Sequence, residues 1–98
     1  MNVSKHIMVR GRVQGLGYRA FVERAALKAG IAGWVRNRRD GSVEALFSGE
    51  AVQVQALIET CRRGPFAARV DTLQEDEAAP EAMALCRPGE LFSVLPTA

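Results

Sequence analysis

Polar and apolar residues alternate between His6 and Val13, near the start of the chain. A period of two residues is that of a strand with one buried face, so this stretch predicts a strand. From about Tyr18 to Ala29 the apolar residues instead recur every three or four positions, with charged residues between them. That spacing predicts an amphipathic helix, and Gly30 follows where a glycine commonly ends one.

Two short strands are predicted next, over residues 33–37 and 42–48, where Val, Trp and Phe are frequent. The pair Asp40-Gly41 lies between them and is typical of a hairpin, because glycine accepts the positive φ that such a turn requires. Alternation in the second strand turns Phe47 toward the same side as its apolar neighbours, which is the side expected to face the helices.

A second helix is predicted from about Glu50 to Arg63, and Gly64-Pro65 follows as expected at a helix end. Its apolar stripe repeats at positions i, i+3, i+4 and i+7, which are Val54, Leu57, Ile58 and Cys61. Residues 68–75 predict a fourth strand, although the alternation slips by one. Residues 76–84 are acidic and alanine-rich, which predicts a surface loop or a weak helical turn. Residues 91–95 predict a short closing edge strand.

This order of elements predicts an α+β fold, the ferredoxin-like βαββαβ sandwich, in which two helices cover one face of an antiparallel sheet. Right-handed crossovers would place the first strand and the second hairpin strand side by side in the centre. With 98 residues and 48% hydrophobic content, residues 1–98 are expected to form one domain that can bury a core without disulfides or metals. Because this fold hosts unrelated activities, function has to be argued from particular residues.

The net charge of +2 is small for a dedicated nucleic-acid binder, although three arginines cluster within residues 36–39. No apolar run approaches the length of a membrane span, and residues 1–8 contain no apolar leader segment. We therefore expect a cytoplasmic protein with reduced thiols at Cys61 and Cys86, and no nucleic-acid or membrane partner. Without a sustained exposed apolar stripe, a monomer is expected.

Glycine occupies three of the first seven positions of the stretch Gly11–Arg19, between the first strand and the first helix. Glycines let the backbone adopt positive φ and leave its N–H groups uncovered. The amides of about Gln14 to Tyr18, together with the start of the helix, are suited to bind an anion. Arg19 falls in the first helical turn, from which its guanidinium can bind two phosphate oxygens. A tight turn with a solvent-exposed arginine fits this stretch equally well.

Several common kinds of site are absent from the sequence. No Gly-Lys-Ser or Gly-Lys-Thr follows the glycine stretch, as a P-loop would need, and the glycine spacing does not fit a dinucleotide-binding fingerprint. His6 is the only histidine, which argues against a zinc site and against Ser/His or Cys/His catalytic pairs. We expect neither a metal nor a cofactor.

Three parts of the chain carry specific motifs: Val13–Arg19, then Gly33–Asn37 with Asp40-Gly41 and Val43-Glu44, and then Gly64-Pro65 with Ala68 and Val70. These motifs resemble those of the acylphosphatase family in residue type, order and spacing. The resemblance covers nearly the whole chain. The resemblance implies a ferredoxin-like domain that hydrolyses the carboxyl–phosphate bond of acyl phosphates without metal or cofactor. It also implies that Arg19 binds the phosphoryl group and that Asn37 positions water.

The resemblance and the glycine stretch together give one set of candidate site residues. Arg19 and Asn37 are the catalytic candidates, and the loop amides of Gln14, Gly15, Leu16, Gly17 and Tyr18 are the substrate-binding candidates. The side chain of Tyr18 is expected in the core. A site that holds the phosphate leaves the acyl group open, so carbamoyl phosphate, acetyl phosphate and phosphorylated glycolytic acids all fit as small-molecule substrates.

Two non-catalytic functions are the alternatives. RNA-recognition domains share this strand order, but their aromatic motif belongs on the third strand, whereas Gly17–Val22 opens a helix. The other alternative is a module that binds carbamoyl phosphate or a phosphorylated partner, similar to the N-terminal domain of large hydrogenase-maturation proteins. The chain has no further domain, which favours a free-standing enzyme.

Overall fold

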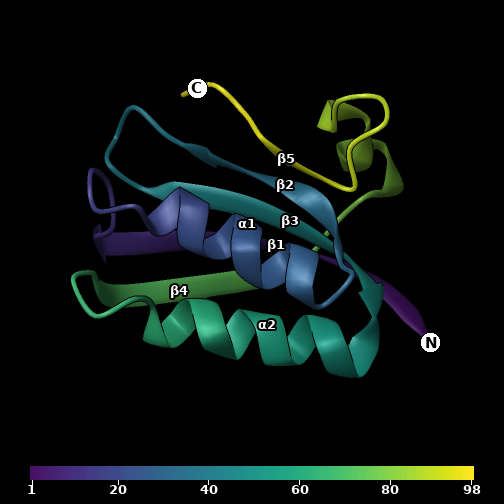
Figure 1. Ribbon diagram of the computed structural model, residues 1–98, viewed down its shortest axis with the longest axis horizontal. Coiled ribbons are helices and arrows are strands. Elements are labelled where there is room, and N and C mark those ends of the chain that lie inside the picture. The colour runs from purple at the N-terminus through teal and green to yellow at the C-terminus, as the bar shows by residue number, and fades with distance from the viewer.

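The computed structural model describes residues 1–98. Its elements are β1 (Asn2–Arg12), α1 (Tyr18–Lys28), β2 (Ala32–Asn37), β3 (Val43–Glu50), α2 (Ala51–Arg63), β4 (Arg69–Glu77), the 3-10 helix η1 (Pro80–Leu85) and β5 (Phe92–Val94). The strands form one sheet in the order β4-β1-β3-β2-β5, and both α-helices lie on the same face of it (Figure 1). The predicted ferredoxin-like fold is confirmed, with β1 and β3 adjacent as expected.

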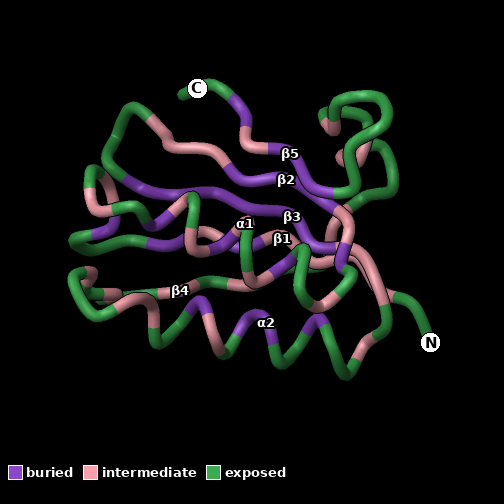
Figure 2. The backbone as a smooth tube through the Cα atoms, in the orientation of Figure 1, coloured by how far each residue is buried: buried purple, intermediate pink, exposed green.

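Alternate residues of the central strands point toward the helices and form the main core. The stripe predicted on α2 is confirmed, since all four of its members are buried. Figure 2 shows buried residues running along β3 and β2, while most of β4 is exposed or half-buried. The main core consists of Ile7, Val9, Val13, Tyr18, Val22, Ala26, Ile31, Val35, Val43, Ala45, Phe47, Val54, Leu57, Ile58, Cys61 and Phe92.

The slip in the alternation of the fourth strand corresponds to a bulge in its pairing with β1. Arg10 lies opposite Thr72, but the next residue, Gly11, lies opposite Val70, so Asp71 has no partner across the ladder. Gly11 has a φ of 135°, and a Cβ atom there would lie 2.2 Å from the carbonyl oxygen of Arg69. The bulge therefore requires glycine at this position.

The closing edge strand was predicted correctly in position, and its direction makes the sheet mixed. β5 runs parallel to β2, with Val35 opposite Val94, whereas the other pairings are antiparallel. The antiparallel sheet predicted for the βαββαβ order is confirmed for its four strands, and β5, whose direction was not predicted, adds one parallel pairing. A single short strand gives no local signal of its direction, because the direction is set by the path of the preceding segment.

The face of the sheet opposite the helices is covered at one end by the segment that includes η1. Trp34 and Leu46 are buried there together with Leu95. The indole Nε1 of Trp34 donates a hydrogen bond of 2.9 Å to the carbonyl oxygen of Ala82. Of the two alternatives for residues 76–84, the helical turn is confirmed over residues 80–84, and residues 76 and 77 extend β4. Neither α-helix has the length and apolar character needed to cross a membrane.

Candidate active site

The ends of β1 and β2 lie next to each other at one end of the sheet. Val43, the first residue of β3, is opposite Val9 on β1 and opposite Asn37 on β2. Both β1 and β2 are antiparallel to β3, so they run in the same direction and finish at the same end. The loop that follows β1 therefore emerges beside Asn37, which is far from it in the sequence.

The loop of residues 13–17 presents free backbone donors. Gly15 and Gly17 have φ values of 77° and 76°, in the left-handed region that glycine adopts without strain. The backbone N–H groups from Gln14 to Ala20 donate to no acceptor in the protein, and the first helical bond is from Phe21 N–H to the carbonyl oxygen of Gly17. A run of uncovered amides at the start of a helix is a suitable anion site.

The starts of the two α-helices differ in how they are capped. The Glu50 carboxylate accepts hydrogen bonds from the N–H groups of Val52 and Gln53, so the protein itself supplies the anion at the start of α2. No side chain caps α1, and its first turn contains no acidic residue. Only at α1 do the helix dipole and the first free amides remain available to an external anion.

A pocket of about 420 Å³ opens at this place and contains both catalytic candidates. Arg19 makes no hydrogen bond or salt bridge within the protein. Its guanidinium is therefore free to bind a ligand anion through two donors. The pocket is lined by Val13, Gly15, Gly17, Tyr18, Arg19, Ala20, Glu23, Asn37 and Val94.

Asn37 is fixed through its backbone while its side chain remains unpaired. Its carbonyl oxygen accepts a hydrogen bond of 3.0 Å from the N–H of Ala98. Its side-chain oxygen, Oδ1, is buried and has no hydrogen-bond partner. An unpaired buried amide oxygen is costly, and no hydrogen bond holds this side chain in place, so its amide is free to turn toward a molecule bound in the pocket that Asn37 lines.

The other loop candidates divide into two groups. Gly15, Gly17 and Tyr18 line the pocket, whereas Gln14 and Leu16 do not. The Gln14 side chain instead donates from Nε2 to the carbonyl oxygens of Arg38 and Ser42, at 2.7 and 2.8 Å. It ties the glycine loop to the turn that follows Asn37.

The core position expected for Tyr18 is confirmed. Its ring is buried, and its hydroxyl donates a hydrogen bond of 2.7 Å to the carbonyl oxygen of Cys61. Burial raises the pKa of the Tyr18 phenol well above its ordinary value and raises the pKa of the Cys61 thiol to about 12. Both groups are therefore neutral at physiological pH. Tyr18 contributes to the pocket only through its packed, uncharged side chain.

Four pocket residues were not among the sequence candidates: Val13, Ala20, Glu23 and Val94. Glu23 follows Arg19 by four positions, which is one helical turn, so helical spacing alone could have placed it on the same face. Val94 could not have been found in this way, because its position depends on the pairing of β5 with β2. No group of three or more metal-ligating side chains comes together in the chain.

Comparison with known proteins identifies the family of this chain. Residues 5–84 match the model of the family described as acylphosphatase. The chain belongs to the acylphosphatase family. An acylphosphatase from Rhodopseudomonas palustris strain BisB18 is 58% identical over 95 residues, which cover 97% of this chain and 96% of that protein. Acylphosphatases are hydrolases that act on acyl phosphates, and this chain is an enzyme of that class.

Solved structures with the same fold include both an acylphosphatase and a domain of a larger protein. The crystal structure of acylphosphatase from Bacillus subtilis matches with a TM-score of 0.81 at 35% identity, covering 97% of this chain and 99% of that one. The structure of full-length HypF matches with a TM-score of 0.82, but at 23% identity and over 12% of its chain. The second likeness shows the fold alone.

The family, the fold and the class of enzyme predicted from the sequence are confirmed. Phe47, the aromatic residue of β3, is buried beneath the helices as predicted. The individual roles of Arg19 and Asn37 stay predictions.

Proposed function

We propose that the free amides of the glycine loop and the guanidinium of Arg19 bind the phosphoryl group of an acyl phosphate, and that Asn37 holds the attacking water. The observation that carries this proposal is that one pocket at the uncapped start of α1 is lined by an unpaired arginine and by an asparagine whose side-chain oxygen has no partner. The products are a carboxylate and inorganic phosphate.

The leaving group explains why a site with so few ionisable residues is sufficient. An acyl phosphate releases a carboxylate, whose conjugate acid has a pKa of about 4, so the leaving oxygen needs no proton. The chemical demand is therefore to stabilise the charge on the phosphoryl oxygens as the bond to the acyl oxygen breaks. Amide N–H groups and a guanidinium that are already in place meet this demand without reorganisation.

Asn37 is suited to orient the nucleophile and unsuited to deprotonate it. A side-chain amide is neutral at every physiological pH, but its unpaired Oδ1 can accept a hydrogen bond from water and hold it in line with the breaking bond. The proton released by the water then passes to a phosphoryl oxygen of the substrate. This route needs no protein base.

The same reasoning limits the range of substrates. Phosphate monoesters have far higher uncatalysed barriers, requiring accelerations of up to about 10²¹, and release alkoxides that need an acid or a metal. We propose that turnover of ordinary sugar phosphates is negligible beside that of acyl phosphates. Small acyl phosphates, including carbamoyl and acetyl phosphate, remain the proposed substrates.

The test is hydrolysis of benzoyl phosphate, followed by ultraviolet absorbance in the presence of a chelator. Arg19→Ala should lower kcat/KM by about 10³-fold or more, by analogy with arginine residues that stabilise phosphoryl transfer. Asn37→Ala should lower kcat by about 10²- to 10³-fold, as the loss of a preorganised polar group does elsewhere. Arg24→Ala and Asn2→Ala are matched controls, because both residues are exposed and lie outside the pocket.

Three outcomes separate the possibilities, with circular dichroism used to confirm folding. Loss of activity in both site variants but in neither control supports the proposal. Full activity in folded Arg19→Ala or Asn37→Ala removes the role of that residue. A folded native chain without turnover that still binds inorganic phosphate would favour a phosphate-binding module.

We also propose that the chain acts as a cytoplasmic monomer without a nucleic-acid or membrane partner. Both cysteines are free, with Cys61 buried and Cys86 half-buried, as suits a reducing compartment. Sedimentation at the monomer mass of 10.6 kDa would support the first part, and a stable dimer would overturn it.

A further inference from the structure

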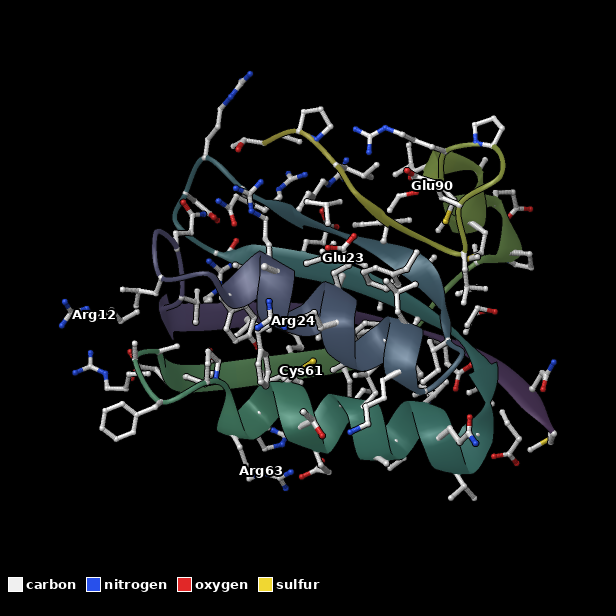
Figure 3. The ribbon with its side chains drawn as sticks, in the orientation of Figure 1. Arg12, Glu23, Arg24, Cys61, Arg63 and Glu90 are labelled. Carbon is white, nitrogen blue, oxygen red and sulfur yellow. The ribbon has the colours of Figure 1, made fainter.

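Glu23 is the only acidic residue that lines the phosphate pocket. It is half-buried on α1, and its carboxylate makes no hydrogen bond or salt bridge with any part of the protein. Figure 3 shows Glu23 on the side of α1 that faces β5, with Arg24 directed elsewhere. An unpaired carboxylate beside a site that binds a phosphate repels the phosphate, so Glu23 does not contribute to phosphate binding.

Arg19 and Glu23, the two charged residues of the pocket, follow each other along the axis of α1. A helix rises about 1.5 Å per residue, so Glu23 lies about 6 Å farther along the axis than Arg19. The free amides and Arg19 are at the start of the helix, where the phosphoryl group would be held. An acyl group pointing away from the loop would pass Ala20 and reach the space between Glu23 and Val94.

We propose that Glu23 determines which acyl groups the enzyme accepts, disfavouring those that carry a negative charge and favouring neutral or cationic ones. Val94 and Ala20 supply the apolar walls of this acyl subsite. The inference rests on the proposed function, because it requires the phosphoryl group to occupy the loop and Arg19. Glu23 is a specificity-determining residue, and it takes no part in breaking the bond.

Coulomb's law sets the size of the expected effect. We take the Glu23 carboxylate and a unit charge on the acyl group to be about 7 Å apart, with an effective dielectric constant of about 40–80. Their interaction then changes kcat/KM by roughly 3- to 7-fold. In about 1 M salt the screening length is roughly 3 Å, so most of this discrimination should disappear. An effect caused by altered packing would not depend on salt in this way.

The experiment compares benzoyl phosphate with its 4-carboxy and 4-trimethylammonio derivatives, in the native chain and in Glu23→Gln and Glu23→Lys. Each derivative is expressed as its kcat/KM relative to benzoyl phosphate, and this ratio is compared between proteins, which cancels the substituent's effect on the leaving group. Glu23→Gln should raise the ratio for the carboxy derivative by about 3- to 7-fold and lower the ratio for the ammonio derivative similarly. Glu23→Lys should reverse the native preference.

Glu81→Gln is the matched control, because Glu81 is exposed on η1, outside the pocket and without a charged partner. It should leave both ratios unchanged. If benzoyl phosphate is hydrolysed but both ratios stay the same in folded Glu23→Gln, the inference is overturned while the proposed function stands. If the native chain hydrolyses no acyl phosphate, the proposed function fails and the inference fails with it.

Discussion

Gly17 directly precedes α1 and has a left-handed backbone conformation with a φ of 76°. A Cβ atom at this position would meet no other atom within 4 Å, so an alanine would be strained by its backbone conformation alone. We expect Gly17→Ala to lower the free energy of unfolding by about 1–2 kcal/mol. We also expect a higher KM for benzoyl phosphate, because relaxation of the strain would turn the loop amides away from the phosphate. Urea denaturation and initial rates measure the two effects.

Two further variants separate backbone conformation from the mere addition of a side chain. Gly17→Asn should recover part of the loss, since asparagine tolerates the left-handed region better than alanine does. Gly49→Ala is the control, because φ there is ordinary and its Cβ would lie 3.5 Å from the Ile31 side chain, a normal contact. An unchanged KM in folded Gly17→Ala would contradict the role of the loop amides.

Single site residues were predictable where short motifs contain them and were missed where the pocket depends on tertiary structure. Arg19 and Asn37 each lie in a motif with recognisable residue types, and both line the pocket. Glu23 has the helical spacing to join them, but a charged residue on an amphipathic helix is usually explained by solvent. Val94 lines the pocket only because β5 pairs with β2, and no local sequence pattern predicts that pairing.

Gln14 connects the glycine loop to the turn between β2 and β3, and the site requires these two segments to keep their relative position. Its Nε2 donates to the carbonyl oxygens of Arg38 and Ser42, which join the glycine loop to the turn between β2 and β3. Both carbonyls also accept backbone hydrogen bonds, so neither is left unpaired without the side chain. We expect Gln14→Ala to cost only about 1–2 kcal/mol in stability. Its kcat should fall by about ten-fold, because small displacements of positioned groups are costly in catalysis.

A substitution of similar shape tests whether this link acts through hydrogen bonding. Gln14→Glu places carboxylate oxygens against two carbonyl oxygens, so it should reduce stability and kcat more than Gln14→Ala does. Gln53→Ala on α2 is the control, since that side chain is exposed and makes no hydrogen bond. Stopped-flow or initial-rate measurements of kcat decide the matter, and an unchanged kcat in Gln14→Ala would show that the loop holds its position alone.

Elements with a sustained period were predicted well, and elements defined by their neighbours were not. The stripe on α2 and the alternation on β1 each repeat often enough to fix the type of element and its buried face. β1 nevertheless begins at Asn2, before the clear alternation, because residues 2–5 pair with the end of β3. η1 has no strong period, and its packing over Trp34 follows from the fold of the whole sheet.

The two faces of the sheet are stabilised by different interactions. Helices bury an apolar core on one face, whereas on the other face Glu44 forms the centre of a charged cluster. Its carboxylate lies 2.6 Å from His6 Nε2 and 2.7 Å from Arg36 Nε, and so connects β3 to both neighbouring strands. Arg36 also stacks over the Trp34 ring at 4.8 Å, which joins the cluster to the region under η1.

This cluster makes the stability of the whole molecule dependent on pH. Burial alone would raise the pKa of Glu44, but hydrogen bonds from His6 and Arg36 outweigh burial and hold the pKa below its ordinary value. A lowered pKa in the folded state means that ionised Glu44 stabilises the fold above the unfolded pKa of about 4.3. That contribution is lost as the pH falls through the lower, folded value.

We therefore expect Glu44→Gln to lower the free energy of unfolding by about 1.5–3 kcal/mol near neutral pH, the usual value of hydrogen bonds to a charged group. The difference from the native chain should begin to shrink as the pH falls below about 4 and should be lost below the lowered folded pKa, where the native carboxyl is protonated as well. Part of the acid sensitivity should persist in the variant, since hydrogen bonds from Ser42 and Arg10 hold the pKa of Asp40 well below its usual range. Urea denaturation between about pH 2.5 and pH 7 measures these differences. Glu81→Gln should follow the native curve throughout, whereas a constant gap between Glu44→Gln and native protein would mean that packing, and not ionisation, accounts for the loss.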